Sequence, residues 1–198
     1  MNVYLIRHGQ TESNSKGRYL GSFEDELSLK GINEIKKVKE YIKNFHFDKV
    51  FCSERKRALD SAKILVDKDI VCDRRLNERD FGIFENKTYS EICDKYPLEK
   101  KAWEEDWISY KIPEGESVAE AYSRVVEFIR ELEKESCENC LIVTHGGIIR
   151  LIYCYILGGD LNIFWKFASK NGSISILKFQ YNNWFIDSII QLGSMRSE

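Results

Sequence analysis

The sequence has no strong excess of charge and no long apolar run. Its 198 residues include 30 lysines and arginines against 32 aspartates and glutamates, which gives a net charge of −2. This balance provides no electrostatic reason to expect a nucleic-acid or an anionic-membrane partner. No run of 18 apolar residues predicts a membrane span, and no basic segment followed by an apolar one suggests a secretory signal. We therefore expect a cytoplasmic protein.

The six cysteines form neither a disulfide framework nor a zinc motif. In a cytoplasmic chain they are expected to be reduced thiols. Cys137 and Cys140 have C-x-x-C spacing, but a zinc site needs further ligands, and no suitably spaced second pair is present. We interpret this segment as a turn before a strand, and we expect no metal ion and no cofactor.

Short apolar runs alternate with helical patterns along most of the chain. The runs at 2–6, 49–52, 70–72 and 140–144 predict strands that are buried on both faces. Apolar residues at three- and four-residue spacing predict helices within 32–45, 58–65 and 118–132, and a buried helix at 148–157. This order predicts an α/β fold, a three-layer sandwich whose mostly parallel sheet carries helices on both faces.

The last third of the chain changes character. The segments 173–180 and 184–191, which flank Asn182 and Asn183, predict a C-terminal hairpin. The segment at about 83–116 is more weakly patterned, and we expect it to form a helical lid over the site. No linker divides residues 1–198, so a single domain is expected.

Only three histidines occur, and two of them share a context. His8 follows the apolar run 3–6, and His145 follows the apolar run 141–143. Because ligands of open α/β sheets bind outside the carboxyl ends of the strands, two parallel strands would deliver both imidazoles to one crevice. Arg7 would make that crevice cationic. The pattern therefore indicates chemistry on a phosphate group.

Each residue type in this pattern suits phosphoryl transfer. A neutral imidazole such as that of His8 can attack phosphorus and hold the phosphoryl group as an N–P bond. Arginine binds phosphate bidentately, and besides Arg7 both Arg55 and Arg57 are candidates, near the start of a predicted helix. Glu78 follows the third predicted strand and could act as a general acid for the leaving group.

The segment Leu5-Ile-Arg-His-Gly-Gln-Thr-Glu-Ser-Asn14 resembles the signature of the histidine phosphatase superfamily, in its phosphoglycerate-mutase-like branch. The resemblance continues in order through Cys52-Ser53…Arg57-Ala58, Leu76-Asn-Glu78 and Val143-Thr-His145-Gly-Gly. It implies that His8 is the phosphorylated nucleophile and that Glu78 protonates the leaving oxygen and then deprotonates water. The residues that it implies bind the phosphoryl oxygens are Arg7, Asn14, Arg57, His145 and Gly146.

The resemblance implies a phosphomonoesterase that hydrolyses a small phosphorylated metabolite through a phosphohistidine. The loops at 81–85 and 113–117 and the stretch from Trp103 to Trp107 look most like those of alpha-ribazole phosphatases, which implies alpha-ribazole 5′-phosphate as the substrate. A metal-independent phosphoserine or sugar phosphatase is an alternative. So is a phosphoglycerate mutase-type phosphotransferase, which the short distance in sequence between Glu78 and His145 disfavours. A homodimer is compatible with each of these.

Two readings outside this chemistry are also open. The stretch Ile64-Leu-Val-Asp67-Lys-Asp69 fits a strand followed by D-x-D, as in haloacid-dehalogenase-type phosphatases, which use Mg²⁺ and an aspartate nucleophile. The helical pattern of 58–65 argues against it. The second alternative is an inactive protein that binds a phosphorylated ligand. The presence of every catalytic residue that the resemblance implies argues against this alternative.

Overall fold

The computed structural model describes residues 1–192 and contains a six-stranded sheet with the order β3-β2-β4-β1-β5-β6. β1 and β4 pair in parallel, as do β4 with β2 and β2 with β3, whereas β5 runs antiparallel to β1 and β6 antiparallel to β5. The predicted mostly parallel α/β sheet is therefore confirmed. The strands are β1 (Asn2–Arg7), β2 (Lys49–Cys52), β3 (Val71–Cys72), β4 (Asn139–Thr144), β5 (Ser173–Gln180) and β6 (Asn183–Gln191).

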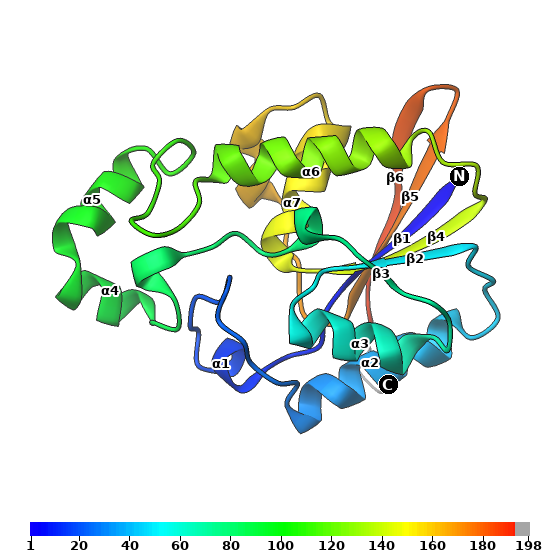
Figure 1. The fold of residues 1–198 in the computed structure, drawn as a ribbon, viewed down its shortest axis with the longest axis horizontal. Coiled ribbons are helices and arrows are strands. Elements are labelled where there is room, and N and C mark those ends of the chain that lie inside the picture. Colours follow the sequence, from blue (N-terminus) through cyan, green and yellow to red (C-terminus); the bar gives the residue numbers. More distant parts are fainter. Residues whose placement is uncertain (193–198) are drawn as a thin grey trace, which may run out of the picture.

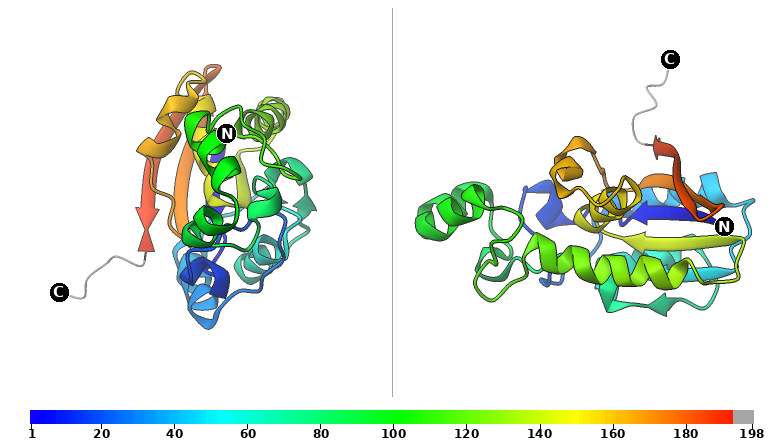
Figure 2. Two further views of the ribbon diagram at one scale, coloured as in Figure 1. Left: turned by 90° about the vertical axis from the view of Figure 1, so that its left-hand side faces the viewer. Right: turned by 90° about the horizontal axis from the view of Figure 1, so that it is seen from above.

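Helices cover both faces of the sheet (Figures 1 and 2). Leu141 and Val143 of β4 pack in a core with α2 and α3, while Ile142 packs in a second core with α6 and α7. Because successive side chains of a strand point to opposite faces, a central strand between two helical layers must be apolar throughout. The helices of these layers are α2 (Leu29–Ile42), α3 (Lys56–Leu65), α6 (Val118–Leu132) and α7 (Gly146–Ile156).

Replacing a side chain in the centre of this sheet should be costly. Leu141 is fully buried and lies on β4, the strand that pairs with both β1 and β2. We expect Leu141→Ala to lower the free energy of unfolding by about 2–5 kcal/mol, since it removes buried methyl groups and leaves a cavity. Urea denaturation would measure this change. Leu98→Ala is the control, because Leu98 is 78 % exposed and its loss should cost under about 0.5 kcal/mol; equal effects of the two changes would contradict the assignment of the core.

Several element boundaries differ from the expected ones. β3 is two residues long and exposed, not a buried strand, because it lies at the edge of the sheet. α2 ends at Ile42, so Phe45 lies beyond it. The hairpin turns at Tyr181 and Asn182, whose φ angles are 54° and 55°, so β6 begins at Asn183, one residue early.

The structure contradicts the haloacid-dehalogenase reading. α3 ends at Leu65, and Asp67 lies in the loop that follows, so this aspartate comes after a helix and not after a strand. No set of three or more His, Cys, Asp or Glu side chains within residues 1–192 is arranged to hold a metal ion.

The segment between Glu78 and α6 contains two α-helices, α4 (Tyr89–Lys95) and α5 (Pro97–Glu105), and a 3-10 helix at Gly82–Phe84. Both α-helices lie beyond the end of the sheet at which β1 and β4 terminate (Figures 1 and 2). They share a small separate core formed by Phe84, Ile92, Trp103 and Ile112. None of the helices within residues 1–192 is long and apolar enough to cross a membrane.

Candidate active site

The sheet topology brings His8 and His145 together. β1 and β4 are neighbours, and Arg7 at the end of β1 is in register with Thr144 at the end of β4. His8 directly follows Arg7, and His145 directly follows Thr144. The centroids of the two imidazole rings lie 5.0 Å apart. His8 is 2 % exposed and His145 is fully buried. The crevice predicted from the two apolar runs is therefore present.

The hydrogen bonds of His8 determine its tautomer. Nδ1 lies 2.7 Å from the carbonyl oxygen of Gly9, and because a carbonyl can only accept, Nδ1 carries the proton. Nε2 is then left with a free lone pair. Burial lowers the pKa of His8 well below its usual value of 6.5, and the nearby charges of Arg57 and Arg7 lower it further. His8 is accordingly a neutral imidazole with an available Nε2 at physiological pH.

A chain of three hydrogen bonds fixes the tautomer of His145. The Oδ1 atom of Asn77 accepts from the backbone N–H of Glu54 at 2.9 Å, which identifies it as the oxygen. The hydroxyl of Ser53 therefore donates to Asn77 Oδ1 at 2.8 Å. The Ser53 oxygen lies 2.7 Å from His145 Nε2 and must accept from it. In the neutral ring the proton is on Nε2, and the buried Nδ1 has no partner within residues 1–192.

Removing this acceptor should weaken the preference of His145 for its tautomer. In Ser53→Ala the Nε2–H group loses its partner, so we expect the population of the Nε2–H tautomer and the free energy of unfolding to fall, the latter by about 1–3 kcal/mol. Nitrogen-15 chemical shifts of the ring would report the tautomer, and urea denaturation the stability. Ser123→Ala is the control, because the Ser123 hydroxyl is exposed and bonds only within its own helix. A wild-type ring that carries its proton on Nδ1 would contradict the assignment.

The buried histidines should make the protein less stable in mild acid. Burial lowers the pKa of both His8 and His145 well below 6.5, so below pH 6.5 the unfolded chain binds protons that the folded chain does not. The free energy of unfolding should therefore fall as the pH drops from 7.5 to 5.5, by about 2–3 kcal/mol for the two rings together. Urea titrations would measure the slope. A double His8→Gln, His145→Gln variant that retains the full slope would contradict this origin.

Arg7 and Asn14 present donors beside His8. The Nη1 atom of Arg7 donates to the carbonyl of Ser169, whereas its buried Nε has no acceptor within residues 1–192. Burial lowers the pKa of Arg7 to about 10, which still leaves it charged at neutral pH. The Oδ1 of Asn14 accepts from the N–H of Thr11 at 3.2 Å and from Asn171 at 3.3 Å. This orientation leaves the Nδ2 group of Asn14 free to donate into the cavity that it lines.

Arg57 lies near the histidines, but its guanidinium mainly holds a loop. Nη1 donates to the carbonyl of Phe23 at 2.9 Å, and Nη2 donates to Gly21 at 2.9 Å and Leu20 at 3.2 Å. Only Nε is buried without a partner in the described chain, so a contact between Arg57 and a phosphoryl oxygen stays a prediction. Arg55, the other candidate, contacts Glu24 at 3.4 Å.

Backbone amides hold Glu78 at the start of α7. Its Oε2 accepts from the N–H of Gly147 at 2.9 Å, and its Oε1 accepts from the N–H of Arg79 at 3.0 Å. A Cβ atom at position 147 would lie 2.3 Å from Oε1 of Glu78, so a larger residue there would push the carboxyl group out of this position. Gly146, the first residue of α7, also lines the cavity.

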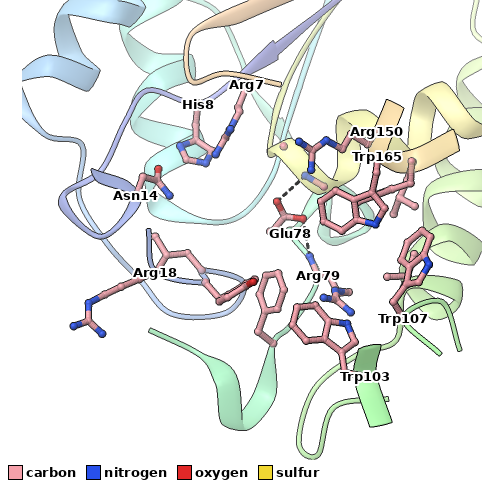
Figure 3. Close-up of a pocket in the computed structure, with 18 residues that line it drawn as sticks. Arg7, His8, Asn14, Arg18, Glu78, Arg79, Trp103, Trp107, Arg150 and Trp165 are labelled. Atoms are coloured by element: carbon pink, nitrogen blue, oxygen red, sulfur yellow. Dashed lines mark hydrogen bonds between the residues drawn. The ribbon is translucent and has the colours of Figure 1, made fainter. Parts of the chain in front are cut away.

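A cavity of about 300 Å³ lies among these groups (Figure 3). Of the predicted site residues, those that line it are Arg7, His8, Asn14, Glu78 and Gly146, whereas Arg57 and His145 are not among its lining residues. Arg79, Arg150 and Trp165 also line the cavity and were not predicted as site residues. Arg150 stacks near Trp165, with the guanidinium carbon 5.1 Å from a ring centroid, while Trp103 and Trp107 of the expected lid line the same cavity. Arg79 directly follows Glu78, and Arg150 lies one helical turn beyond Gly146, so their proximity to the predicted residues was the available signal.

Two imidazoles and Arg7 at the ends of adjacent parallel strands, with further arginines from α3, α7 and the loop after Glu78, are typical of an enzyme that acts on phosphate esters. The chain belongs to the histidine phosphatase superfamily (branch 1), whose family model matches residues 3–191. It is 32% identical over 181 residues to the adenosylcobalamin/alpha-ribazole phosphatase of Salmonella typhimurium, covering 89% of this chain and 90% of that protein. It is 30% identical over 182 residues to phosphoserine phosphatase 1 of Hydrogenobacter thermophilus, covering 90% and 86%.

Solved structures agree with this assignment. The alpha-ribazole phosphatase from Shigella flexneri superposes with a TM-score of 0.88 at 29% identity, over 94% of both chains. A variant phosphoserine phosphatase from Entamoeba histolytica, in complex with phosphoserine, superposes with a TM-score of 0.80 at 27% identity, over 95% of both chains. The predictions of the family, of its fold and of phosphatase as the enzyme class are therefore confirmed.

Proposed function

We propose that the protein hydrolyses a small phosphomonoester without a metal ion, through a phosphohistidine on Nε2 of His8. The observation that carries this proposal is the tautomer of His8. Its Nδ1–H is bound to Gly9, its pKa is lowered by burial, and its lone pair lies on Nε2. A neutral imidazole surrounded by guanidinium groups is poised to attack phosphorus.

In the first step, Nε2 of His8 forms a bond to phosphorus while the bond from phosphorus to the ester oxygen breaks. The leaving oxygen takes a proton from Glu78 in its acid form. Arg7, Asn14 and the amide of Gly146 donate to the equatorial phosphoryl oxygens, together with Arg57 through Nε. The negative charge of a bound phosphate dianion favours the protonated form of the His145 ring, and the protonated ring donates from Nδ1 as well.

In the second step, water attacks the phosphorus of the phosphohistidine and the N–P bond breaks. Glu78, now a carboxylate, accepts a proton from the water, and the electron pair of the N–P bond returns to Nε2. Inorganic phosphate leaves and both residues regain their starting states. We further propose that α4 and α5, with their flanking loops at about 83–116, form a lid over the cavity within a single domain.

Two substrate classes follow from the relatives. Alpha-ribazole 5′-phosphate would place an aromatic ring among Trp103, Trp107 and Trp165, which line the cavity. Phosphoserine is favoured by a different observation, the presence of Arg79 and Arg150 in the cavity.

A mutase reaction would need the phosphohistidine shielded from water. A cytoplasmic location and a homodimer stay predictions, and gel filtration with light scattering tests the latter.

A panel of phosphate esters tests the proposal. The wild-type chain should release phosphate from p-nitrophenyl phosphate in the presence of EDTA, and from at least one of alpha-ribazole 5′-phosphate and phosphoserine. Activity that needs added Mg²⁺, or transfer of the phosphoryl group to a second hydroxyl in place of its release to water, would overturn the proposal.

A further inference from the structure

Two cysteine sulfurs lie close together at the end of the sheet away from His8 and His145. The Sγ atoms of Cys137 and Cys140 are 2.6 Å apart, and both cysteines are free thiols. A disulfide bond is about 2.0 Å long, so a relative shift of about 0.6 Å would bring the two sulfurs to bonding distance. The thioether sulfur of Met1 is farther away, at 3.6 Å from Cys137 Sγ and 3.9 Å from Cys140 Sγ.

The backbone between the two cysteines is held in a fixed bend. Cys137 lies in the loop after α6, and Cys140 is the second residue of β4. The carboxylate of Asp48 accepts from the N–H of Glu138 at 2.8 Å and from the N–H of Asn139 at 2.9 Å. A disulfide needs a backbone that presents the two side chains to each other. This bend already does so, and the bond could form without rearrangement of the loop.

The two thiols differ in exposure, which gives them different roles. Cys137 is half-buried, so a small reagent can reach its sulfur, whereas Cys140 is fully buried. Burial raises the pKa of the Cys140 thiol, and the contact with Cys137 raises it further. Thiol–disulfide exchange begins with a thiolate that has access to the other sulfur. An external disulfide therefore meets Cys137 first, and Cys140 is placed to attack Cys137 from inside.

A positive charge lies beside the pair. The ammonium group of Lys49, which is paired with Glu135, is close enough to interact with the sulfurs of both Cys137 and Cys140. A nearby lysine favours the thiolate form of a cysteine, which is the form that reacts with disulfides. The surroundings of the pair therefore support exchange chemistry as well as proximity.

We propose that Cys137 and Cys140 form a reversible dithiol–disulfide pair that is oxidised by small-molecule disulfides. In the first step, the Cys137 thiolate attacks one sulfur of the small disulfide, the S–S bond of that molecule breaks, and one thiolate leaves. In the second step, Cys140 loses its proton to water and attacks the sulfur of Cys137, and the second thiolate leaves. The pair gives up two electrons, the small disulfide becomes two thiols, and an excess of that thiol reverses both steps.

This pair is separate from the phosphatase site. β4 begins at Asn139, beside the pair, and ends at Thr144, beside His145. The five residues from Cys140 to His145 span about 16 Å of extended strand. Figure 1 shows the loop between α6 and β4 beside the N-terminus, at the end of the sheet away from α4 and α5. The proposal is therefore independent of the proposed function, and failure of either leaves the other standing.

Counting free thiols in glutathione buffers tests the proposal. The full-length protein is equilibrated with mixtures of reduced and oxidised glutathione, quenched in acid, unfolded and alkylated, and the labels are counted by intact-mass spectrometry. The reduced protein should carry a label on each of its six cysteines. The oxidised protein should lose two labels, and peptide mapping should show Cys137 joined to Cys140. Excess reduced glutathione should restore both labels.

Two variants separate the roles of the thiols. Cys140→Ala should accumulate a mixed disulfide between Cys137 and glutathione, because no internal thiol displaces the glutathione. Cys137→Ser should react with oxidised glutathione at position 140 at least about tenfold more slowly than wild type reacts at the pair, because the remaining thiol is buried. Cys72→Ser is the matched control. It removes an exposed thiol from β3 and should still lose two labels on oxidation.

Three results would overturn the proposal. The first is a wild-type protein that keeps all six labels in an excess of oxidised glutathione. The second is a disulfide that joins Cys52 to Cys72, which are neighbours in register on β2 and β3. The third is the loss of two labels in Cys137→Ser.

Discussion

His8→Ala should reduce kcat/KM for every phosphomonoester by at least about 10⁴-fold, because it removes the atom that accepts the phosphoryl group. The comparison is wild type against variant on p-nitrophenyl phosphate in EDTA, with phosphate release as the readout. The fold of the variant should be checked by circular dichroism, since His8 is buried. Binding of inorganic phosphate should persist, because the arginines remain.

His46→Ala provides the control for this experiment. The His46 side chain is 77 % exposed and lies 3.8 Å from Asp48 in a loop after α2, far along the chain from the site. Its removal should leave kcat/KM within about twofold of wild type. Activity of the folded His8→Ala protein within tenfold of wild type would move the nucleophile to another residue.

Glu78→Gln should separate substrates by their leaving groups. An alkoxide needs a proton in order to leave, whereas p-nitrophenolate does not. We therefore expect kcat/KM for an alkyl phosphate to fall by about 10²–10⁴-fold and kcat/KM for p-nitrophenyl phosphate to change little. Gln keeps one carbonyl oxygen that can accept from the N–H of Gly147, while its amide group replaces the oxygen that accepts from the N–H of Arg79.

The two steps make a further distinction possible in Glu78→Gln. Because kcat/KM reports only the step up to phosphorylation, it isolates the acid role, and a burst of p-nitrophenol followed by slow turnover would report the loss of the base role. Equal losses of kcat/KM for alkyl and aryl phosphates would contradict the assignment of Glu78 as the acid.

The arrangement of the sheet could be predicted because local patterns record burial. The runs before His8 and His145 are apolar throughout, which a strand between two helical layers requires. The capping box of Ser117 and Glu120 likewise marks the start of α6, as the structure shows. β3 was misjudged because its apolar residues sit at an edge, and an edge position depends on the order of strands in space.

The pairing of the arginines could not be predicted from local pattern. Arg57 reaches the carbonyl of Phe23, 34 positions away, and Arg18 reaches Glu91, 73 positions away. Arg79 and Arg150 form no ion pair within residues 1–192, although Glu78 lines the same cavity. Sequence patterns identify which residues carry charge, whereas the free charges at a site follow from distances that tertiary packing sets.

The most direct test of the account is to trap and locate the phosphoenzyme. Glu78→Gln should be mixed with ³²P-labelled p-nitrophenyl phosphate in EDTA, quenched in alkali, in which phosphohistidine is stable, and mapped by mass spectrometry. The account predicts up to one phosphoryl group per chain, on Nε2 of His8. Label on another residue, or turnover without any labelled protein, would contradict it.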